Sequence, residues 1–333
     1  MHNPLVAFSI TTALAILAGA PAHALISDQD VARSVTFGGS CGKCDFTGRK
    51  LVGANFMSSQ FIKAVMVNAD LRGANIVNSN FTGADLRGAD LRGAQAPQTY
   101  FIKVNFTGAK LDGLTAPAAT FRDATLNGVG LRSAVLTASN FRSADMNGAQ
   151  LIGAQLAAAD FTDANARGAN FNSSELQASQ MAGHFDGATF FRAELDGAHL
   201  AGGTFAGADF SRASLDGADL RGVDLSKARG LKQDQIDDAC ADGNTRLPSG
   251  LKPGACNHGM SREIQAAMAE AKQAARLEAS QGAVEARRQA LEAARQALEM
   301  VREMNLSGGR HPSIPPVPPA PPAPPAPPQA PHW

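Results

Sequence analysis

A bulky apolar side chain recurs at every fifth position over most of the chain. Of the 28 positions taken in steps of five from Phe46 to Met181, 25 hold Phe, Leu, Ile or Met, and the other three hold Ala. After one step of four residues the pattern resumes at Phe185 and continues without a break to Leu225. Because an α-helix has a period of about 3.6 residues and a strand a period of about 2, a period of five predicts a turn inside every repeat.

The other positions of the repeat are consistent with turns and with stacking. Ala usually stands two residues before the bulky residue, Asp or Asn directly before it, and Gly two residues after it, as in Ala84 to Gly88. Gly, Asp and Asn tolerate tight turns. Units this short cannot bury a core alone, so the chain is predicted to be a solenoid in which stacking supplies the burial. Because 14 of the 17 Phe residues occupy the bulky position, we interpret them as core.

The repeat Ala-Asp/Asn-Leu/Phe-x-x resembles that of the pentapeptide-repeat family over about 37 units. The resemblance implies an all-β solenoid, a right-handed, four-sided β-helix in which the bulky residue and the small residue two before it point inward. Four repeats then form one coil, so residues twenty apart lie above one another. At roughly 4.8 Å per coil, nine coils give a rod of about 43 Å.

The best-known members of that family mimic the charge and shape of duplex DNA and bind gyrase. In this chain, residues 41–231 contain 18 Lys and Arg against 17 Asp and Glu, a net charge of +1. A DNA mimic needs strong negative charge, and a nucleic-acid-binding protein needs a basic stripe. Nucleic acid is therefore not an expected partner, and a DNA-mimicking gyrase-binding protein is kept only as the alternative function.

Residues 1–24 resemble a secretory signal peptide. An apolar stretch from Leu5 to Gly19 precedes the small-residue site Ala22-His23-Ala24, which predicts cleavage after Ala24 and a periplasmic or secreted protein. The residues before the apolar stretch include no Lys or Arg, so a retained membrane anchor is the alternative. The stretch is short for a spanning helix, which needs about 20 residues, and the mature chain is predicted to have no transmembrane segment.

Four cysteines fall into two pairs, Cys41 with Cys44 and Cys240 with Cys256. Export favours a structural disulfide within each pair. The pairs flank the predicted rod at opposite ends, so one zinc site cannot use all four, and His258 near Cys256 leaves such a site short of a fourth ligand. The spacing of Cys41 and Cys44 is also that of a redox motif, which is the alternative interpretation. We expect no metal and no cofactor.

The chain changes character on either side of the repeats. We expect an N-terminal cap over residues 25–40, the β-helix over 41–230 and a C-terminal cap over 231–260. The cap at the C-terminal end is predicted to contain a short helix from Gln233 to Ala241, and to cover the open end of the solenoid.

Residues 261–306 are predicted to form a long Ala-rich α-helix because good helix formers occupy most positions. Triplets of an aliphatic residue, Glu and Ala or Met recur every seven residues, which is the period of a coiled coil. Small residues in the seam favour self-association into a homo-oligomer, and packing back along the same molecule's rod is the alternative. The candidate seam consists of Leu277, Ala283, Val284, Ala290, Leu291, Ala297 and Leu298.

Residues 307–333 form a Pro-rich tail. The stretch from Pro312 to Pro331 holds 12 of the 18 prolines, which predicts a polyproline II conformation without a packed core. We interpret the tail as a stiff spacer, and a docking ligand for an aromatic groove is the alternative.

No catalytic constellation stands out in the sequence. His184 and His199 directly precede bulky positions and are expected to face solvent, without a nucleophile at a suggestive spacing. Carboxylates such as Asp160 and Asp163 occupy turn positions, where they are expected to satisfy backbone groups. The protein is therefore predicted not to be an enzyme.

One of the four predicted sides is depleted of charge. When the outward positions from residue 45 to 183 are sorted by side, this side has one charge in 21 positions, against five, eight and seven on the others. Charge depletion is typical of an interface core. Two coils also place Ala and Pro here, at 96–97 and 116–117, which removes two bulky core residues and two backbone donors. The candidate interaction face consists of Met57, Val77, Pro97, Pro117, Val135, Thr137 and Ala157.

The occupant of this face is expected to be another rod or the Ala-rich helix, and neutral drift of a tolerant surface is the alternative. Taken together, the features predict a non-enzymatic structural or protein-binding scaffold that is exported to the cell envelope. Its protein partner is not identified by the sequence.

Overall fold

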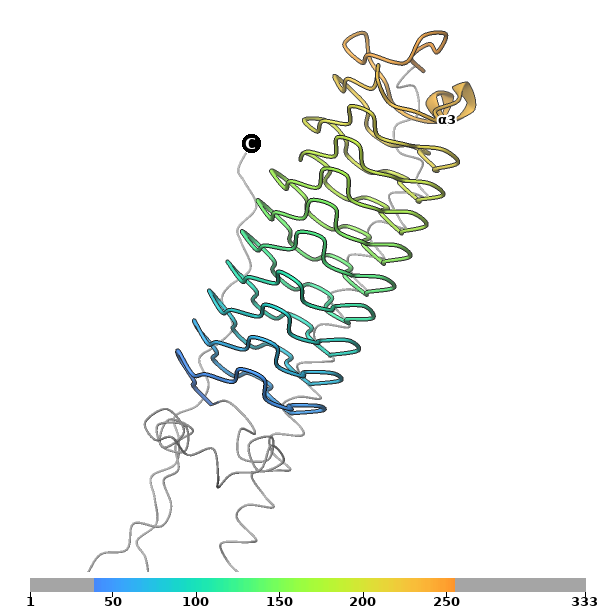
Figure 1. The fold of residues 1–333 in the computed structure, drawn as a ribbon. Helices are drawn as coiled ribbons and strands as arrows, with labels where there is room; N and C mark the ends of the chain where they lie inside the picture. Colours follow the sequence, from blue (N-terminus) through green and yellow to red (C-terminus); the bar gives the residue numbers. More distant parts are fainter. Residues whose placement is uncertain (1–38, 255–333) are drawn as a thin grey trace, which may run out of the picture. The chain divides into compact units, whose positions relative to one another are not determined.

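The structure, a computed structural model, describes residues 39–254, which wind into a rod of stacked coils (Figure 1). The chain divides into two compact units, Met1–Arg287 and Arg288–Trp333, and the rod belongs to the first. Parallel bridges join residues 20 apart, such as Ser40 to Gln60 and Gln60 to Asn80. Four columns of such bridges run along the rod, so each coil has four sides, as the resemblance implies.

Each bridge joins single residues, so residues 39–254 contain no continuous β-strand. Ten successive bridges join Ser40 to Cys240. At about 4.8 Å per step this column is roughly 48 Å long, close to the length expected from the repeat count.

Each repeat is a turn that bonds to the coils beside it, as the repeat at Leu51 illustrates. Ala54 N donates to Leu51 O at 3.1 Å and closes the turn, while Leu51 N and Gly53 N donate to carbonyls of the next coil. Gly53 has a φ of +64°, in the left-handed region that glycine enters without a steric penalty. The fifth position of the repeat therefore favours Gly because the turn requires a positive φ.

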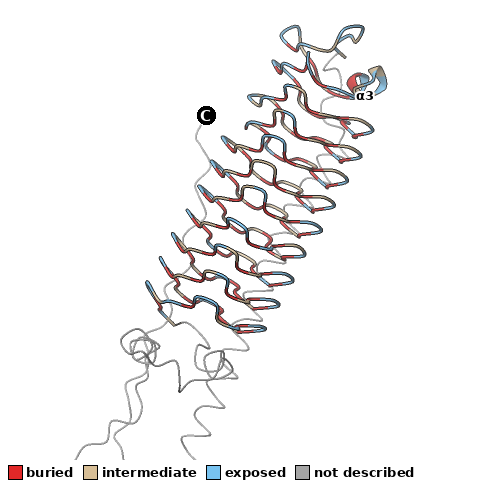
Figure 2. Cartoon of the chain, viewed as in Figure 1, coloured by how far each residue is buried: buried red, intermediate tan, exposed pale blue. Residues whose placement is uncertain are grey.

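The core is a continuous column of apolar side chains inside the coils. Figure 2 shows that buried residues recur in every coil along the rod. Phe residues are its largest side chains, and those on one side stack directly: the ring centroids of Phe61 and Phe81 are 5.0 Å apart. The small inward position is usually Ala, but one corner carries buried hydroxyls instead. Thr99 Oγ1 donates to Ile76 O at 2.6 Å, and therefore bonds one coil to the one before it.

The four-residue step lies between Met181 and Phe185, and it changes the bridge spacing from 20 to 19, as in Asn165 to His184. Gly183 occupies the tightest place of this step. A Cβ atom there would lie 2.6 Å from the carbonyl oxygens of Phe161 and Ala164. The chain therefore accommodates the repeat that is one residue short at a position where only glycine fits, and the coils continue to stack beyond it.

The helix α3, Gln233–Asp237, lies at the C-terminal end of the rod (Figure 1). Ile236 is fully buried against the last coils, and Gln235 Nε2 donates to the carbonyls of Phe210 and Ala213 at 3.1 and 2.7 Å. The helix is shorter than predicted because the chain rejoins the ladder, where Cys240 N donates to Ala218 O at 2.8 Å. A spanning helix, long and apolar enough to cross a bilayer, does not occur in the described part.

Several predictions fall on residues outside 39–254. These are the signal peptide, most of the N-terminal cap, Cys256, the Ala-rich helix with its seam, and the Pro-rich tail.

Candidate interaction face

The charge-poor face is the side of the rod built by residues 55–58 and their equivalents in the following coils. Consecutive bridges from Asn55 through Asn75 to Glu175 join its coils in one column. The structure therefore brings all seven candidate residues onto one side of the rod. The members of the charge-poor face are residues 55–58, 75–78, 95–98, 115–118, 135–138, 155–158 and 175–178, excluding the inward-pointing residue of each.

Ion pairs lie on the other three sides of the rod. Asp85 and Arg87 flank one core residue, and their closest side-chain atoms are 2.7 Å apart; Asp90 and Arg92 repeat the arrangement at 2.6 Å. The hydrogen bonds from each guanidinium lower the pKa of the neighbouring carboxyl below its ordinary value. Within residues 39–254, no ion pair involves a residue of the charge-poor face.

Asp and Asn residues before the core position bind the backbone rather than a ligand. Asp160 Oδ1 accepts from Thr162 N at 2.9 Å, and Asp45 Oδ1 accepts from Thr47 N at 2.9 Å. These bonds satisfy the amide that follows the core residue, which donates to no backbone carbonyl in any regular repeat. The prediction that the repeated carboxylates serve the turns is consistent with this geometry.

The same amide explains the two prolines of the charge-poor face. Pro97 and Pro117 occupy the position directly after the core residue. Because regular repeats form no backbone bond from that amide, the prolines remove no ladder hydrogen bond, and the expected loss of two donors has no structural consequence. The alanines before them, Ala96 and Ala116, are fully buried in the bulky position.

Four outward residues of the charge-poor face are buried, namely Met57, Val77, Pro117 and Ala178. Met57 is 2% exposed and Val77, one coil further, is 6% exposed, and they form a cluster apart from the main core. Val52 and Ile62 occupy the same position of neighbouring repeats on other sides, yet they are 54% and 40% exposed. Val67, Ile102 and Ile152 at the same position are half-buried, so burial there varies with the neighbouring side chains, and Met57 and Val77 lie in one cluster.

Alanines with left-handed backbones line the second outward position of the face. From residue 58 to 178 this position contains no glycine, although glycine is frequent at the same place on other sides. A left-handed conformation costs a residue with a Cβ about 1–2 kcal/mol. The last four residues of this run have φ angles of 55° to 56° and are Ala118, Ala138, Ala158 and Ala178.

The side continues beyond the four-residue step, where its character changes. Bridges carry the column from Glu175 to Glu194 and on to Ser214, which places Asp196 and Asp216 on the same side. The predicted face ended before the four-residue step and did not include this acidic end. The sequence signal for it is the period of five, shifted by one residue after Met181.

The cysteines lie at the ends of the rod. Cys41 and Cys44 form a disulfide in the first repeat, with Cα atoms 5.5 Å apart, and Cys41 is buried in the core. Cys240 is also disulfide-bonded. The described cysteines include no free thiol.

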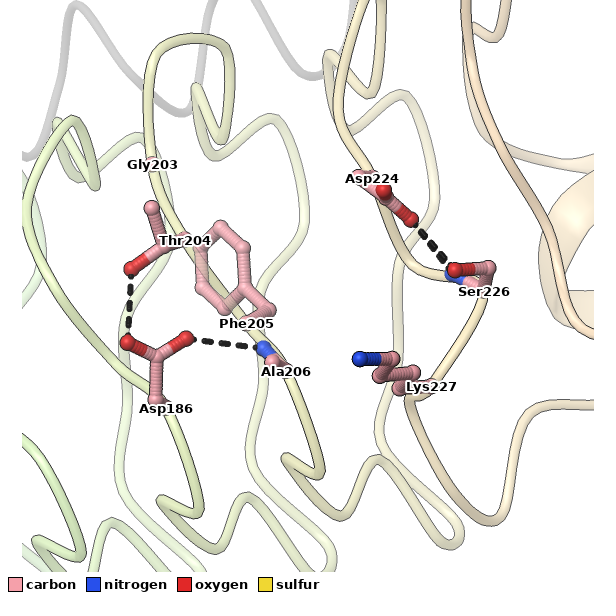
Figure 3. Close-up of a pocket in the computed structure, with 8 residues that line it drawn as sticks. All are labelled: Asp186, Gly203, Thr204, Phe205, Ala206, Asp224, Ser226 and Lys227. Carbon is pink, nitrogen blue, oxygen red and sulfur yellow. Dashed lines mark hydrogen bonds between the residues drawn. The ribbon is translucent and has the colours of Figure 1, made fainter.

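One surface pocket of about 300 Å³ lies near the C-terminal end of the rod (Figure 3). It opens where no bridge joins Thr204 to Asp224 of the next coil, although the neighbouring columns continue. Asp186 accepts hydrogen bonds from Thr204 Oγ1 and Ala206 N at 3.1 and 2.9 Å, and Asp224 accepts from Ser226 N at 3.0 Å (Figure 3).

Asp186 is therefore engaged by the next coil, and Asp224 by its own turn. A cluster of His, Cys, Asp or Glu suited to a metal ion does not occur among the residues described. His184 and His199, on neighbouring sides of the rod, face outward, and Asp160 and Asp163 lie on turns.

Comparisons with known proteins bear on the fold and on the family. A family model described as "Pentapeptide repeats" matches in eight copies, over residues 40–76, 79–113, 118–151, 149–183 and 185–229. The structure is similar to HetL of the cyanobacterium Nostoc sp., a protein involved in heterocyst differentiation regulation. That match has 25% identity and a TM-score of 0.51, and it covers 63% of this chain and 90% of HetL.

A second solved structure, full-length QnrB1, is a plasmid-mediated fluoroquinolone resistance protein. It is 16% identical with a TM-score of 0.28, over 62% of this chain and 94% of QnrB1. No curated protein matched significantly.

Proposed function

Because the chain belongs to the pentapeptide-repeat family, whose members fold as right-handed β-helices, we propose that it is a non-catalytic scaffold that binds a protein through its charge-poor face. The observation that carries this proposal is the face itself, a side without ion pairs that presents apolar and small side chains along seven coils. Charge depletion with apolar burial is the composition of a protein–protein interface core.

A protein partner suits the rod better than a nucleic acid. The acidic and basic residues of the other sides pair with one another, as Asp85 does with Arg87, so the rod presents neither a continuous anionic nor a continuous cationic surface. A DNA-mimicking gyrase-binding protein remains the second candidate, and the acidic end with Glu194 and Asp196 is the feature that favours it.

We further propose export to the cell envelope. Residues 1–24, which resemble a signal peptide, support export. The disulfide between Cys41 and Cys44 is consistent with export because disulfides persist in oxidising compartments. The Ala-rich segment with its candidate seam is proposed to associate with other copies, and the Pro-rich tail to act as a spacer.

Export is tested by fractionating cells that express the native chain and sequencing the N-terminus of the mature protein. The proposal expects a periplasmic chain that begins at Leu25. An uncleaved chain in the cytoplasm would overturn export and would return gyrase to first place. The mass in solution, measured with and without residues 261–306, tests self-association through that segment, because an unchanged monomer mass excludes it.

Partner binding is tested with charge substitutions on two sides of the rod. Thr137→Arg and Ala157→Arg place charges on the charge-poor face, whereas Thr107→Arg and Ser143→Arg are matched controls at exposed positions of other sides. Proteins retained from an envelope extract by the wild type and the controls, but lost with the face variants, support the function. Retention that is indifferent to the face variants contradicts it.

A further inference from the structure

Three arginines towards the C-terminal end of the rod have no carboxylate partner. Most arginines of the described chain form an ion pair, as Arg87 does with Asp85 at 2.7 Å. Arg192, Arg212 and Arg229 form no ion pair with any residue between 39 and 254. All three are exposed and belong to successive coils of one side, and we call them the cationic end.

An outward aromatic ring holds two of these arginines together. Phe191 follows the core residue of its repeat and is half-buried on the surface of the rod. The guanidinium carbon of Arg192 lies 5.3 Å from the centroid of this ring, and that of Arg212, one coil further, lies 5.6 Å from it. Because the face of an aromatic ring attracts cations, Phe191 keeps both guanidiniums at one place although their charges repel.

The carboxylates near the cationic end do not neutralise it. Asp209 is the one acidic residue against the three arginines on this side between residues 189 and 229, and its Oδ1 accepts from Ser211 N at 2.9 Å. The hydrogen bond from Ser211 lowers the pKa of Asp209, and the charge of Arg229 adds a smaller contribution. Glu194, on the next side, accepts from Gln177 Nε2 at 2.5 Å. The site of Arg192 and Arg212 therefore carries uncompensated positive charge.

Another arginine pair on the same side shows how the rod compensates such charges elsewhere. Arg72 and Arg92 also lie one coil apart, but Arg72 pairs with Asp70 at 2.7 Å and Arg92 with Asp90 at 2.6 Å. Like charges on directly neighbouring strands are destabilising, and these carboxylates remove the repulsion. At Arg192 and Arg212 the described chain supplies no such anion.

We propose that the cationic end binds an acidic protein segment, one of whose carboxylates accepts hydrogen bonds from Arg192 and Arg212 together. The planar fork of a guanidinium matches the geometry of a carboxylate, and such bonds are among the stronger hydrogen bonds. Successive coils are about 4.8 Å apart, close to the distance of about 5–6 Å between the Cβ atoms of helical residues three or four apart. A helix with two acidic residues at that spacing therefore matches the arginines of successive coils.

A protein segment suits this site better than a nucleic acid. A nucleic-acid backbone requires a continuous track of basic residues. The unpaired cations extend over three coils only, since the arginines at positions 72 and 92 of the same side are paired, and the acidic residues Glu194 and Asp196 lie on the next side. The inference adds a second surface to the rod and does not rest on the charge-poor face.

Binding of a fluorescent Glu-rich peptide to the full chain, followed by anisotropy, tests the site. The same peptide with Gln in place of each Glu is the ligand control. We expect Arg192→Gln combined with Arg212→Gln to weaken binding of the Glu peptide about tenfold or more, because hydrogen bonds to charged groups are lost. Arg72→Gln combined with Arg92→Gln is the matched control, since it changes the net charge equally on the same side, and it should leave the affinity unchanged.

Phe191→Leu tests the role of the ring while both arginines are kept. Loss of the cation–π contacts should weaken binding about twofold to fivefold. An affinity that is indifferent to this change would overturn the positioning role of Phe191.

Three results would overturn the acidic segment as the ligand. These are equal binding of the Glu and Gln peptides, equal losses in the two double arginine variants, and tighter binding of a single-stranded oligodeoxythymidine than of the Glu peptide. The last result would assign the cationic end to nucleic acid. None of them bears on the charge-poor face, whose test uses Thr137→Arg and Ala157→Arg, so the two surfaces can fail independently.

Discussion

Phe121 and Phe141 stack face to face one coil apart, with ring planes 5° from parallel and centroids 4.9 Å apart. Phe141 stacks in the same way on Phe161, at 5.1 Å and 7°. Each ring therefore fills the space between two coils, and its removal opens a cavity bounded by both neighbours. The strict period of five is what brings identical side chains into this register.

Phe141→Ala should lower the free energy of unfolding by about 3–5 kcal/mol, the usual loss for a buried Phe. Urea unfolding followed by circular dichroism measures the change. Tyr100→Ala is the control, because Tyr100 is 39% exposed and its removal should cost under about 0.5 kcal/mol. Equal losses for the two variants would show that the stack does not support the coils.

Thr99→Val should cost about 1 kcal/mol, the net value of a buried hydrogen bond, since the Oγ1 bond to Ile76 O at 2.6 Å is lost while the shape is kept. Thr107→Val is the comparison. Its hydroxyl is exposed and bonds only to the side chain of Asn105 at 2.7 Å, so the unfolding midpoint in urea should move less. A larger shift for Thr107→Val would contradict a stabilising role for the buried hydroxyl.

Ala138→Gly should stabilise the rod despite removing a methyl group. The left-handed backbone, with a φ of 56°, costs Ala about 1–2 kcal/mol, and the greater entropy of an unfolded Gly offsets about 0.5–1 kcal/mol of the relief. Ala134→Gly, at a buried inward position of the same coil, should destabilise instead. Thermal unfolding of the two variants should therefore shift in opposite directions, and a lower melting temperature for Ala138→Gly would contradict the expected relief.

Arg87→Gln should raise the pKa of Asp85 back towards its ordinary value, because the hydrogen bond from Arg87 is what lowers it. A carboxyl with a lowered folded pKa stabilises the fold above its unfolded pKa of about 3.9, and this contribution is lost as pH falls through the folded pKa. The variant should therefore be less stable than the wild type near neutral pH, by at most about 1 kcal/mol for so exposed a pair, and equally stable in strong acid.

Carboxyl NMR of Asp85 measures this pKa directly. Arg92→Gln, which removes the partner of Asp90 instead, is the matched control and should leave the titration of Asp85 in place. A pKa of Asp85 that is indifferent to Arg87→Gln would refute the assigned cause.

The sequence predicted the rod because its period is exact enough to assign every residue to the core, a turn or a side. Phe46 and Leu225 lie inward at opposite ends, and both were assigned from spacing alone. The shortened α3 was not predicted, because its end is set by the pairing of Cys240 with Ala218 of the preceding coil. Propensity along the chain contains no information on that contact.

The charge-poor face was predicted as a set of positions, but two of its properties were not. The burial of Met57 depends on what lies outside its own repeat, and the left-handed φ of Ala138 depends on the turn that the fold imposes. Neither follows from residue type. Pro97 lies on the face, and the loss of its backbone donor has no structural consequence, because that amide forms no backbone bond in regular repeats.

The short step between Met181 and Phe185 behaves like a dislocation in a crystal. One residue is missing from a single layer, yet the layers on either side keep their alignment, as the bridges from Glu175 to Glu194 and Ser214 show. The deletion of one residue is thus accommodated within one turn. An inserted or deleted coil of twenty residues instead changes the length of the rod by about 4.8 Å. The dimensions of each side can evolve in whole layers while its chemical identity is preserved.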